Sequence, residues 1–280
     1  MRKVMAKNSY QTEWNGINLL EIAKDKATLN KNGLPNSLFY KKFYNKLKEK
    51  SFNVNDEWKN LKRNTSTMLE SIINDVANEL NIEAKKLSII SIGCGLGIVE
   101  LPFIEKGYNI TLHEIQSESL DFIKEKVKQR NLNIRTIEGN ITDLMIMEKY
   151  DIVYLGFIEY TFTQKKEYQK FLSSLYNLLN TNGYLISIES TPDFTKKNLK
   201  NYVGDFLRII GLKRKHPKDA IYWGVLRTLD EKIFFWKKSG FTLKEYGIID
   251  ANFLNILYRS KDLNNKIQTN NSIGFLIGKK

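Results

Sequence analysis

Short apolar runs recur along the chain from residue 87 onward, separated by longer segments. Leu87–Ile92 is rich in β-branched residues, which is typical of a strand buried on both faces of a parallel sheet. Similar runs follow at Tyr108–Leu112, Asn133–Glu138 and Tyr150–Gly156, and the apolar residues of 98–104 have helical spacing. This alternation of strand and helix predicts an α/β fold built on a doubly wound sheet.

Three glycines follow the first predicted strand. Gly93, Gly95 and Gly97 allow a tight turn with positive φ and let a ligand approach the backbone where a Cβ would collide. Glu114 ends the second strand at the same edge of the sheet, where a carboxylate can accept hydrogen bonds from two vicinal ribose hydroxyls. Ile98 stands where the dinucleotide fingerprint needs Gly or Ala, which disfavours NAD. The pattern therefore predicts another nucleoside ligand.

The G-x-G-x-G turn, with Glu114 on the next strand, resembles the first two motifs of the class I S-adenosylmethionine-dependent methyltransferases. Asn140 stands where this family usually has an acid near the adenine, and Tyr150–Gly156 is similar to the family's fourth strand, which opens on an acid such as Asp151. The resemblance implies S-adenosyl-L-methionine as the cofactor and S-adenosyl-L-homocysteine as the product. It implies a cofactor site made of Gly93, Gly95, Gly97, Glu114, Ile115, Asn140, Ile141 and Gly156.

The same resemblance implies a Rossmann-like, seven-stranded, mostly parallel sheet. Its remaining elements are expected as a fifth strand at Tyr184–Glu189, a helix at Leu229–Ser239, a sixth strand at Thr242–Ile249 and a seventh at Ser272–Ile277. The last two strands fit the antiparallel end of the family's sheet. We expect the cofactor-binding core over residues 86–280, with residues 191–228 as a cap insertion after strand five.

Residues 1–85 are expected to form an N-terminal helical cap over the substrate region. Helical spacing predicts helices over Asn15–Lys26, Asp56–Leu69 and Thr67–Leu80, with a cap at Ser66 or Thr67. An aromatic stripe at helical spacing lies between Pro35 and Phe52, and core packing is its default explanation. As an alternative, some aromatic residues of this cap line a substrate pocket; the candidates are Tyr10, Trp14, Tyr40 and Tyr44.

Catalysis by this family requires the acceptor, the methyl carbon and the sulfur to be held in line. If the acceptor is a hydroxyl, Glu159 after strand four is the best candidate for a base, with Tyr160 shaping the pocket or hydrogen-bonding the acceptor. The alternative is that Glu159 forms an ion pair with a nearby lysine, such as Lys165 or Lys166. His216 is a secondary catalytic candidate. His113, beside Glu114, is expected to pack or cap.

The missing motifs narrow the acceptor to an oxygen or nitrogen of a small molecule or sugar. Residues 156–159 lack the Asn/Asp-Pro-Pro-aromatic motif of enzymes that methylate adenine in DNA, and the single cysteine, Cys94, lies in the wrong loop to attack cytosine. No metal is expected. RNA or protein methylation remains an alternative, as do transfer of another group from the same cofactor and a non-catalytic module that binds the cofactor.

The composition agrees with an intracellular enzyme. The sequence shows no signal peptide and no stretch of membrane-spanning length, so we expect a cytoplasmic protein without membrane insertion. The net charge of +13 raises the question of nucleic acid, but lysines are spread along the whole chain. The one concentrated basic cluster lies at Lys213–Lys218. A small-molecule acceptor is therefore favoured over nucleic acid.

Overall fold

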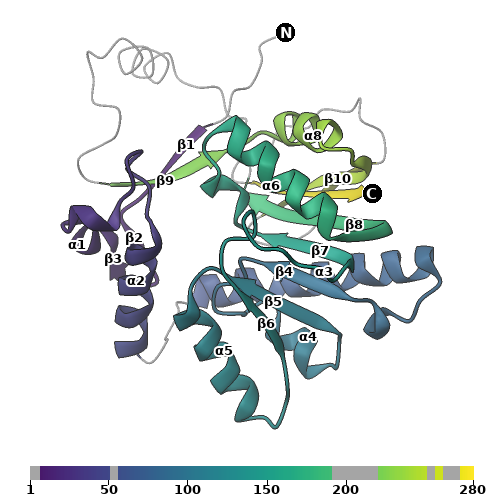
Figure 1. The fold of residues 1–280 in the computed structure, drawn as a ribbon, viewed down its shortest axis with the longest axis horizontal. Coiled ribbons are helices and arrows are strands. Elements are labelled where there is room, and N and C mark those ends of the chain that lie inside the picture. Colours follow the sequence, from purple (N-terminus) through teal and green to yellow (C-terminus); the bar gives the residue numbers. More distant parts are fainter. Residues whose placement is uncertain (1–6, 51–55, 191–219, 251–255, 261–271) are drawn as a thin grey trace.

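The computed structural model describes residues 7–50, 56–190, 220–250, 256–260 and 272–280 (Figure 1). Its centre is a sheet with the strand order β11-β10-β12-β8-β7-β4-β5-β6. Five neighbouring strands run parallel, and β12 is antiparallel to both β8 and β10. The bounds of the five parallel strands are β4 (Ile89–Ile92), β5 (Ile110–Glu114), β6 (Arg135–Glu138), β7 (Tyr150–Gly156) and β8 (Leu179–Ser190).

The far end of the sheet contains the two remaining predicted strands and one more. β10 (Thr242–Asp250) and β12 (Ser272–Lys279) are the predicted sixth and seventh strands. β11 (Ile256–Ser260) pairs antiparallel with β10 and adds an eighth strand at the edge. The seven predicted strands and their mostly parallel arrangement are thus confirmed, and β11 is an addition to them.

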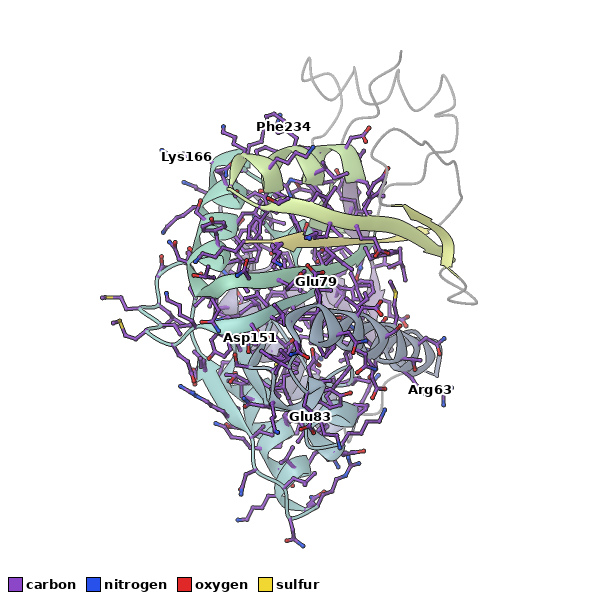
Figure 2. The ribbon with its side chains drawn as sticks, turned by 90° about the vertical axis from the view of Figure 1, so that its right-hand side faces the viewer. Arg63, Glu79, Glu83, Asp151, Lys166 and Phe234 are labelled. Atoms are coloured by element: carbon purple, nitrogen blue, oxygen red, sulfur yellow. The ribbon has the colours of Figure 1, made fainter. Side chains whose placement is uncertain are left out.

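Helices cover both faces of this sheet. On one face lie α3 (Asp56–Leu80), α4 (Leu101–Glu105) and α5 (Ser117–Lys128), whose apolar residues share a core cluster with β4 and β5. On the other face lie α6 (Lys165–Leu178) and α8 (Leu229–Lys238). In Figure 2, Phe234 of α8 and Lys166 of α6 are at the outer surface, while Glu79 of α3 lies beneath the sheet. Lys244 and Lys279 approach Glu79 at 3.2 and 3.1 Å.

Two helix predictions need correction. The predicted helices on either side of Thr67 are a single helix, α3, and Ser66 is buried within it rather than capping a new helix. The helix after the glycine turn begins at Leu101, because residues 98–100 form turns. α3 packs on the sheet although it precedes residue 85, and the domain boundary at that residue stays a prediction.

The N-terminal region is less helical than predicted. In place of a helix over Asn15–Lys26 the chain forms a hairpin of β2 (Glu13–Trp14) and β3 (Ile17–Asn18), followed by short helices α1 (Leu19–Ala23) and η1 (Lys26–Thr28). Asn15 and Gly16 have φ of 52° and 71°, the conformation that an Asn-Gly hairpin turn requires. The predicted aromatic stripe does lie on a helix, α2 (Ser37–Glu49), which Asn36 caps.

A second small sheet joins the N-terminus to the region after strand five. β1 (Lys7–Gln11) pairs antiparallel with β9 (Ile221–Leu226), which falls inside the predicted 191–228 insertion. Residues 191–219 of that insertion lie outside the described residues. Figure 1 shows β1, β9 and α2 together beside the main sheet, where they form a separate layer. Trp223 of β9 and Phe39 and Phe43 of α2 share the core of this layer.

Candidate active site

A cavity of about 1000 Å³ opens at the carboxyl ends of β4, β5 and β7. Its lining combines the sheet edge with the N-terminal layer. The sheet edge contributes Gly93, Gly95, Glu114, Ile115, Asn140, Ile141 and Gly156, and the N-terminal layer and β9 contribute Gln11, Trp14, Tyr40, Phe43, Tyr44 and Trp223. The volume is at the upper end of the range for ligand pockets, about 300–1000 Å³, so it has room for more than one small ligand.

The three glycines of the turn have different steric reasons to be glycine. All three have positive φ, between 58° and 69°. A Cβ on Gly93 would lie 2.3 Å from Cδ1 of Ile158, and one on Gly97 would lie 2.9 Å from Cδ1 of Ile123. A Cβ on Gly95 would meet only the Tyr44 hydroxyl at 3.6 Å. Gly93 and Gly97 therefore allow packing, whereas Gly95 leaves space on the cavity side.

Glu114 is buried at the end of β5, with 8% of its surface exposed. Its Oε2 accepts a hydrogen bond from Gly95 N at 2.9 Å, and its Oε1 accepts one from Ile115 N at 2.7 Å. Burial raises the pKa of this carboxyl above its ordinary value, and the backbone hydrogen bonds oppose that shift. Each oxygen keeps a further acceptor position, so the side chain is held rigidly and can still bind a diol.

The loop after β6 carries Asn140 and Ile141, two of the residues predicted to bind the cofactor, and both line the cavity. Oδ1 of Asn140 accepts hydrogen bonds from Thr142, and its Nδ2 donates to Asp143 at 2.7 Å. The Asn140 amide is thus engaged within its own loop, although the residue lines the cavity. Ile141 is buried against the cavity, whereas Ile115 is 46% exposed. The two apolar side chains are suited to contact a flat base.

Aromatic residues form the other end of the cavity. Trp14 stacks on Phe43 with the ring centroids 4.4 Å apart, and Trp223 meets Trp14 edge-on at 5.6 Å. The Trp223 indole N–H donates to the Tyr160 hydroxyl at 3.1 Å. Burial raises the pKa of Tyr160 and of the nearby Tyr40, so both phenols stay protonated at neutral pH. On α2, Tyr40, Phe43 and Tyr44 therefore both pack in a core and line the cavity, whereas Phe39 packs in the core only.

The structure places Glu159 away from the cavity. Its carboxylate is 1% exposed, lies 3.1 Å from Nζ of Lys232 and accepts a hydrogen bond from the Tyr168 hydroxyl at 2.8 Å. The structure thus has the ion pair of the alternative interpretation, with Lys232 as the lysine, whereas Lys166, one of the two examples, points outward in Figure 2. The geometry does not support Glu159 as a base, because other side chains enclose its carboxylate. Tyr160, the neighbouring prediction, does line the cavity.

The two histidines and the single cysteine are the remaining candidates from the sequence. His216 lies outside the described residues, as does the basic cluster Lys213–Lys218. His113 caps Gly139, with its Nε2 2.8 Å from that carbonyl oxygen, and burial lowers its pKa to about 4. Burial also raises the pKa of the Cys94 thiol well above its ordinary value, which leaves it protonated.

Sequence reasoning missed Lys62, which lies on α3 and lines the cavity next to the glycine turn. Its Nζ is 4.4 Å from the centroid of the Phe157 ring. Burial lowers its pKa to about 8, and the negative charges of Glu100 and Glu189 oppose that shift. Nothing in the sequence distinguishes this lysine from the many others, because its position depends on how α3 crosses the sheet.

Comparison with known proteins agrees with this geometry. Residues 89–183 match a family described as "Methyltransferase domain". A ubiquinone biosynthesis O-methyltransferase from Rickettsia akari is 27% identical over 155 residues, which cover 55% of this chain and 59% of that protein. A ribosomal RNA small subunit methyltransferase A from Mesomycoplasma hyopneumoniae is 29% identical over 174 residues, covering 56% and 66%. The chain thus matches about three fifths of the length of these relatives.

A solved structure shows the same fold. The SAH-bound magnesium protoporphyrin IX methyltransferase from Synechocystis PCC 6803 superposes with a TM-score of 0.53 at 17% identity. The superposition covers 81% of this chain and 89% of that one. Residues 89–183 are thus similar to a methyltransferase domain, and the chain has the fold of the class I S-adenosylmethionine-dependent methyltransferases, without assignment to a subfamily.

The cofactor of this class is S-adenosylmethionine, and the cavity residues fit it. The buried Glu114 carboxylate, the free space at Gly95 and the apolar pair Ile115 and Ile141 match a ribose, a close ligand chain and a flat base. Within the described ranges, no three metal-binding side chains lie close enough together to hold an ion. Of the helices formed by the described residues, none has the length and apolar character needed to cross a membrane.

Proposed function

We propose that the chain transfers the methyl group of S-adenosylmethionine to an oxygen or nitrogen of a small molecule bound in the aromatic half of the cavity. One observation carries the proposal: a single cavity runs from Glu114 at the sheet edge to Trp14 and Trp223 in the N-terminal layer. A cofactor held at the first end would direct its methyl toward the second. An acceptor in the aromatic half would then lie in the same cavity as the methyl group.

In this proposal the sheet edge holds the cofactor. Glu114 would accept the ribose hydroxyls, Ile115 and Ile141 would contact the adenine, and the glycine turn would follow the amino-acid portion. Lys62 would approach the carboxylate of that portion, since its ammonium lies beside the turn. Asn140 would contribute through its place in the loop, since its amide is engaged by Thr142 and Asp143.

The N-terminal layer would position the acceptor. Trp14 and Trp223 provide apolar surface, and the protonated hydroxyls of Tyr40 and Tyr160 can donate hydrogen bonds to an acceptor oxygen. The bound cofactor supplies an electrophilic methyl group. Because the Glu159 carboxylate is enclosed by other groups, alignment of the reactants and exclusion of water would carry catalysis.

The relatives support the acceptor class in different degrees. The Rickettsia protein is an O-methyltransferase of ubiquinone biosynthesis, which favours a hydroxyl on a small molecule. The ribosomal RNA relative and the net charge of +13 favour RNA as the second candidate. The aromatic lining agrees better with the first candidate, because flat apolar walls suit a small ring and not a phosphate backbone.

A labelling experiment separates these candidates. The full chain is incubated with S-adenosylmethionine carrying a deuterated methyl group, and with phenols, amines or short RNA. We expect labelled product from a phenol or amine, identified by mass spectrometry. Label in RNA alone would transfer the proposal to RNA, and a larger mass increase would indicate transfer of the aminocarboxypropyl group. Cofactor binding without any product would indicate a non-catalytic module.

A further inference from the structure

The turn that carries Tyr160 is held from outside by a carboxylate. This turn, η3 (Glu159–Thr161), follows β7 and has no side-chain cap from Ile158. Instead, Oε1 of Glu189 at the end of β8 accepts hydrogen bonds from the backbone N–H groups of Ile158 and Glu159, the second at 2.7 Å. An anion at the start of a helical turn satisfies its free N–H groups and complements its dipole.

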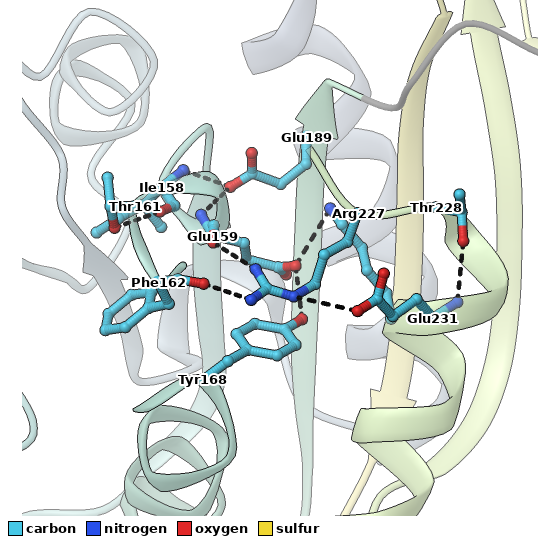
Figure 3. A network of polar contacts seen from close by, with 10 residues as sticks. Ile158, Glu159, Thr161, Phe162, Tyr168, Glu189, Arg227, Thr228 and Glu231 are labelled. Atoms are coloured by element: carbon cyan, nitrogen blue, oxygen red, sulfur yellow. Dashed lines mark hydrogen bonds and ion pairs between the residues drawn. The ribbon is translucent and has the colours of Figure 1, made fainter. Parts of the chain in front are cut away.

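The other end of the same turn is held by a cation. The Arg227 guanidinium donates to the carbonyl oxygens of Glu159 and Phe162, the first at 3.2 Å. Its Cζ lies 4.1 Å from the centroid of the Tyr168 ring, and its Nε is 3.9 Å from Glu231. Figure 3 shows these residues converging on the turn from β8, from α6 and from the segment that enters α8. Arg227 directly follows β9, which carries Trp223.

The charges of this cluster balance inside the protein. We call Glu159, Glu189, Arg227 and Lys232 the charge network; all four are at most 2% exposed. Glu159 is the partner of Lys232, and Glu189 and Arg227 bind the backbone of the turn. Buried charges cost stability unless they are paired and hydrogen-bonded. Apolar side chains of similar volume would stabilise this region at least equally. Stability alone therefore does not explain the charge network.

The turn and β9 together form the wall of the acceptor half of the cavity. Tyr160, Thr161 and Phe162 line it from the turn, and Trp223 lines it from β9. The two parts touch closely: a Cβ on Gly224 would lie 2.1 Å from the Tyr160 carbonyl oxygen. The hydrogen bond from Trp223 to the Tyr160 hydroxyl joins them across the wall.

We propose that the charge network positions the acceptor wall, with Glu189 and Arg227 as positioning residues that fix Tyr160 against Trp223. This rests on the proposed function, since it assigns the wall to the acceptor. Neither Glu189 nor Arg227 lines the cavity, so each would act on the acceptor only through the backbone of η3. A network of fixed charges sets the direction of several backbone hydrogen bonds at once, which apolar packing does not do.

The test reads the wall directly and needs no acceptor. The chain has four tryptophans, so its nitrogen-15 spectrum should show four indole N–H signals, and Trp223→Phe identifies the one that matters. In Glu189→Leu the Trp223 signal should shift toward its position in Tyr160→Phe. Glu189→Gln keeps an amide oxygen that can accept both N–H groups, so its signal should stay near the wild-type position. Glu83→Gln, on the exposed surface, is the control.

If Glu189→Leu does not fold, Glu189→Asp replaces it, because the shorter side chain cannot reach both N–H groups. A Trp223 signal that stays at the wild-type position in either folded variant would overturn the proposal. Binding of S-adenosylhomocysteine should remain unchanged in both. With an acceptor found by labelling, KM for that acceptor should rise roughly ten- to hundredfold in the Leu or Asp variant and recover in Glu189→Gln. Failure of the wild type to bind S-adenosylhomocysteine would instead count against the proposed function of the cavity, whatever the Trp223 signal does.

Discussion

The ion pair between Glu159 and Lys232 is buried on both sides, with 1% and 2% of the side chains exposed. Glu159→Gln would leave the Lys232 ammonium without its counter-charge. We predict a loss of about 3–5 kcal/mol of unfolding free energy in urea titrations, with cofactor affinity unchanged. The double variant Glu159→Gln, Lys232→Met should recover much of that loss. A large fall in turnover at unchanged stability would instead restore Glu159 as a base.

His113 gives the fold a defined sensitivity to acid. Its pKa is lowered to about 4, against an ordinary value of 6.5, because the imidazole is buried. Between these values the unfolded chain binds a proton that the folded chain does not, so stability falls as pH drops through that window. The wild type should lose on the order of 1–2 kcal/mol more than His113→Gln between pH 7 and pH 5. Equal losses in the two proteins would contradict this assignment.

Lys62 can be tested with a pair of ligands. Lys62→Met keeps the apolar stem and removes the ammonium, so affinity for S-adenosylhomocysteine should fall roughly tenfold in calorimetry. 5′-Methylthioadenosine lacks the amino-acid carboxylate and should bind both proteins equally. An equal loss for the two ligands would mean that Lys62 supports the fold of the cavity and does not bind the carboxylate.

At the scale of elements, the first part of the N-terminal layer can be removed while the residues assigned to the cofactor stay in the chain. Removing residues 1–30 takes away β1, β2, β3, α1 and η1 but leaves the glycine turn and Glu114. We predict that affinity for S-adenosylhomocysteine stays within about threefold while turnover is lost. Trp14→Ala should also lower turnover, although it leaves the elements of the N-terminal layer in place. Full turnover after the deletion would place the acceptor elsewhere.

The elements differ in how far the sequence predicts them. β7 has the predicted bounds, because Tyr150–Gly156 is an apolar run that a buried strand requires. The chain forms a hairpin at Asn15 and not the predicted helix, because the Asn-Gly turn signal overrides the apolar spacing of residues 15–26. The break expected at Thr67 is absent because Ser66 is buried inside the continuous helix α3. Apolar periodicity thus predicts the regular elements and fails where a turn signal or a tertiary contact decides the structure.

The whole molecule brings together residues that lie far apart in sequence. The cofactor residues could be predicted because each follows a strand, and parallel strands end at one edge. The acceptor wall could not, because β1 pairs with β9 across more than two hundred residues, and Glu189 meets Ile158 through the neighbouring strands β7 and β8. Contacts between such distant segments produce no recurring pattern of residues in the sequence. Only the arrangement of the chain shows that Tyr160 and Trp223 form one surface.

The central claim is that the cavity binds S-adenosylmethionine through Glu114 and the glycine turn. The most direct test is a calorimetric titration of S-adenosylhomocysteine into the wild type, Glu114→Ala, Gly95→Leu and the surface control Glu83→Ala. We predict micromolar-scale binding to the wild type and the control, loss of most or all binding in the other two with circular dichroism unchanged, and no competition from NADH. Wild-type affinity in both Glu114→Ala and Gly95→Leu would contradict the account.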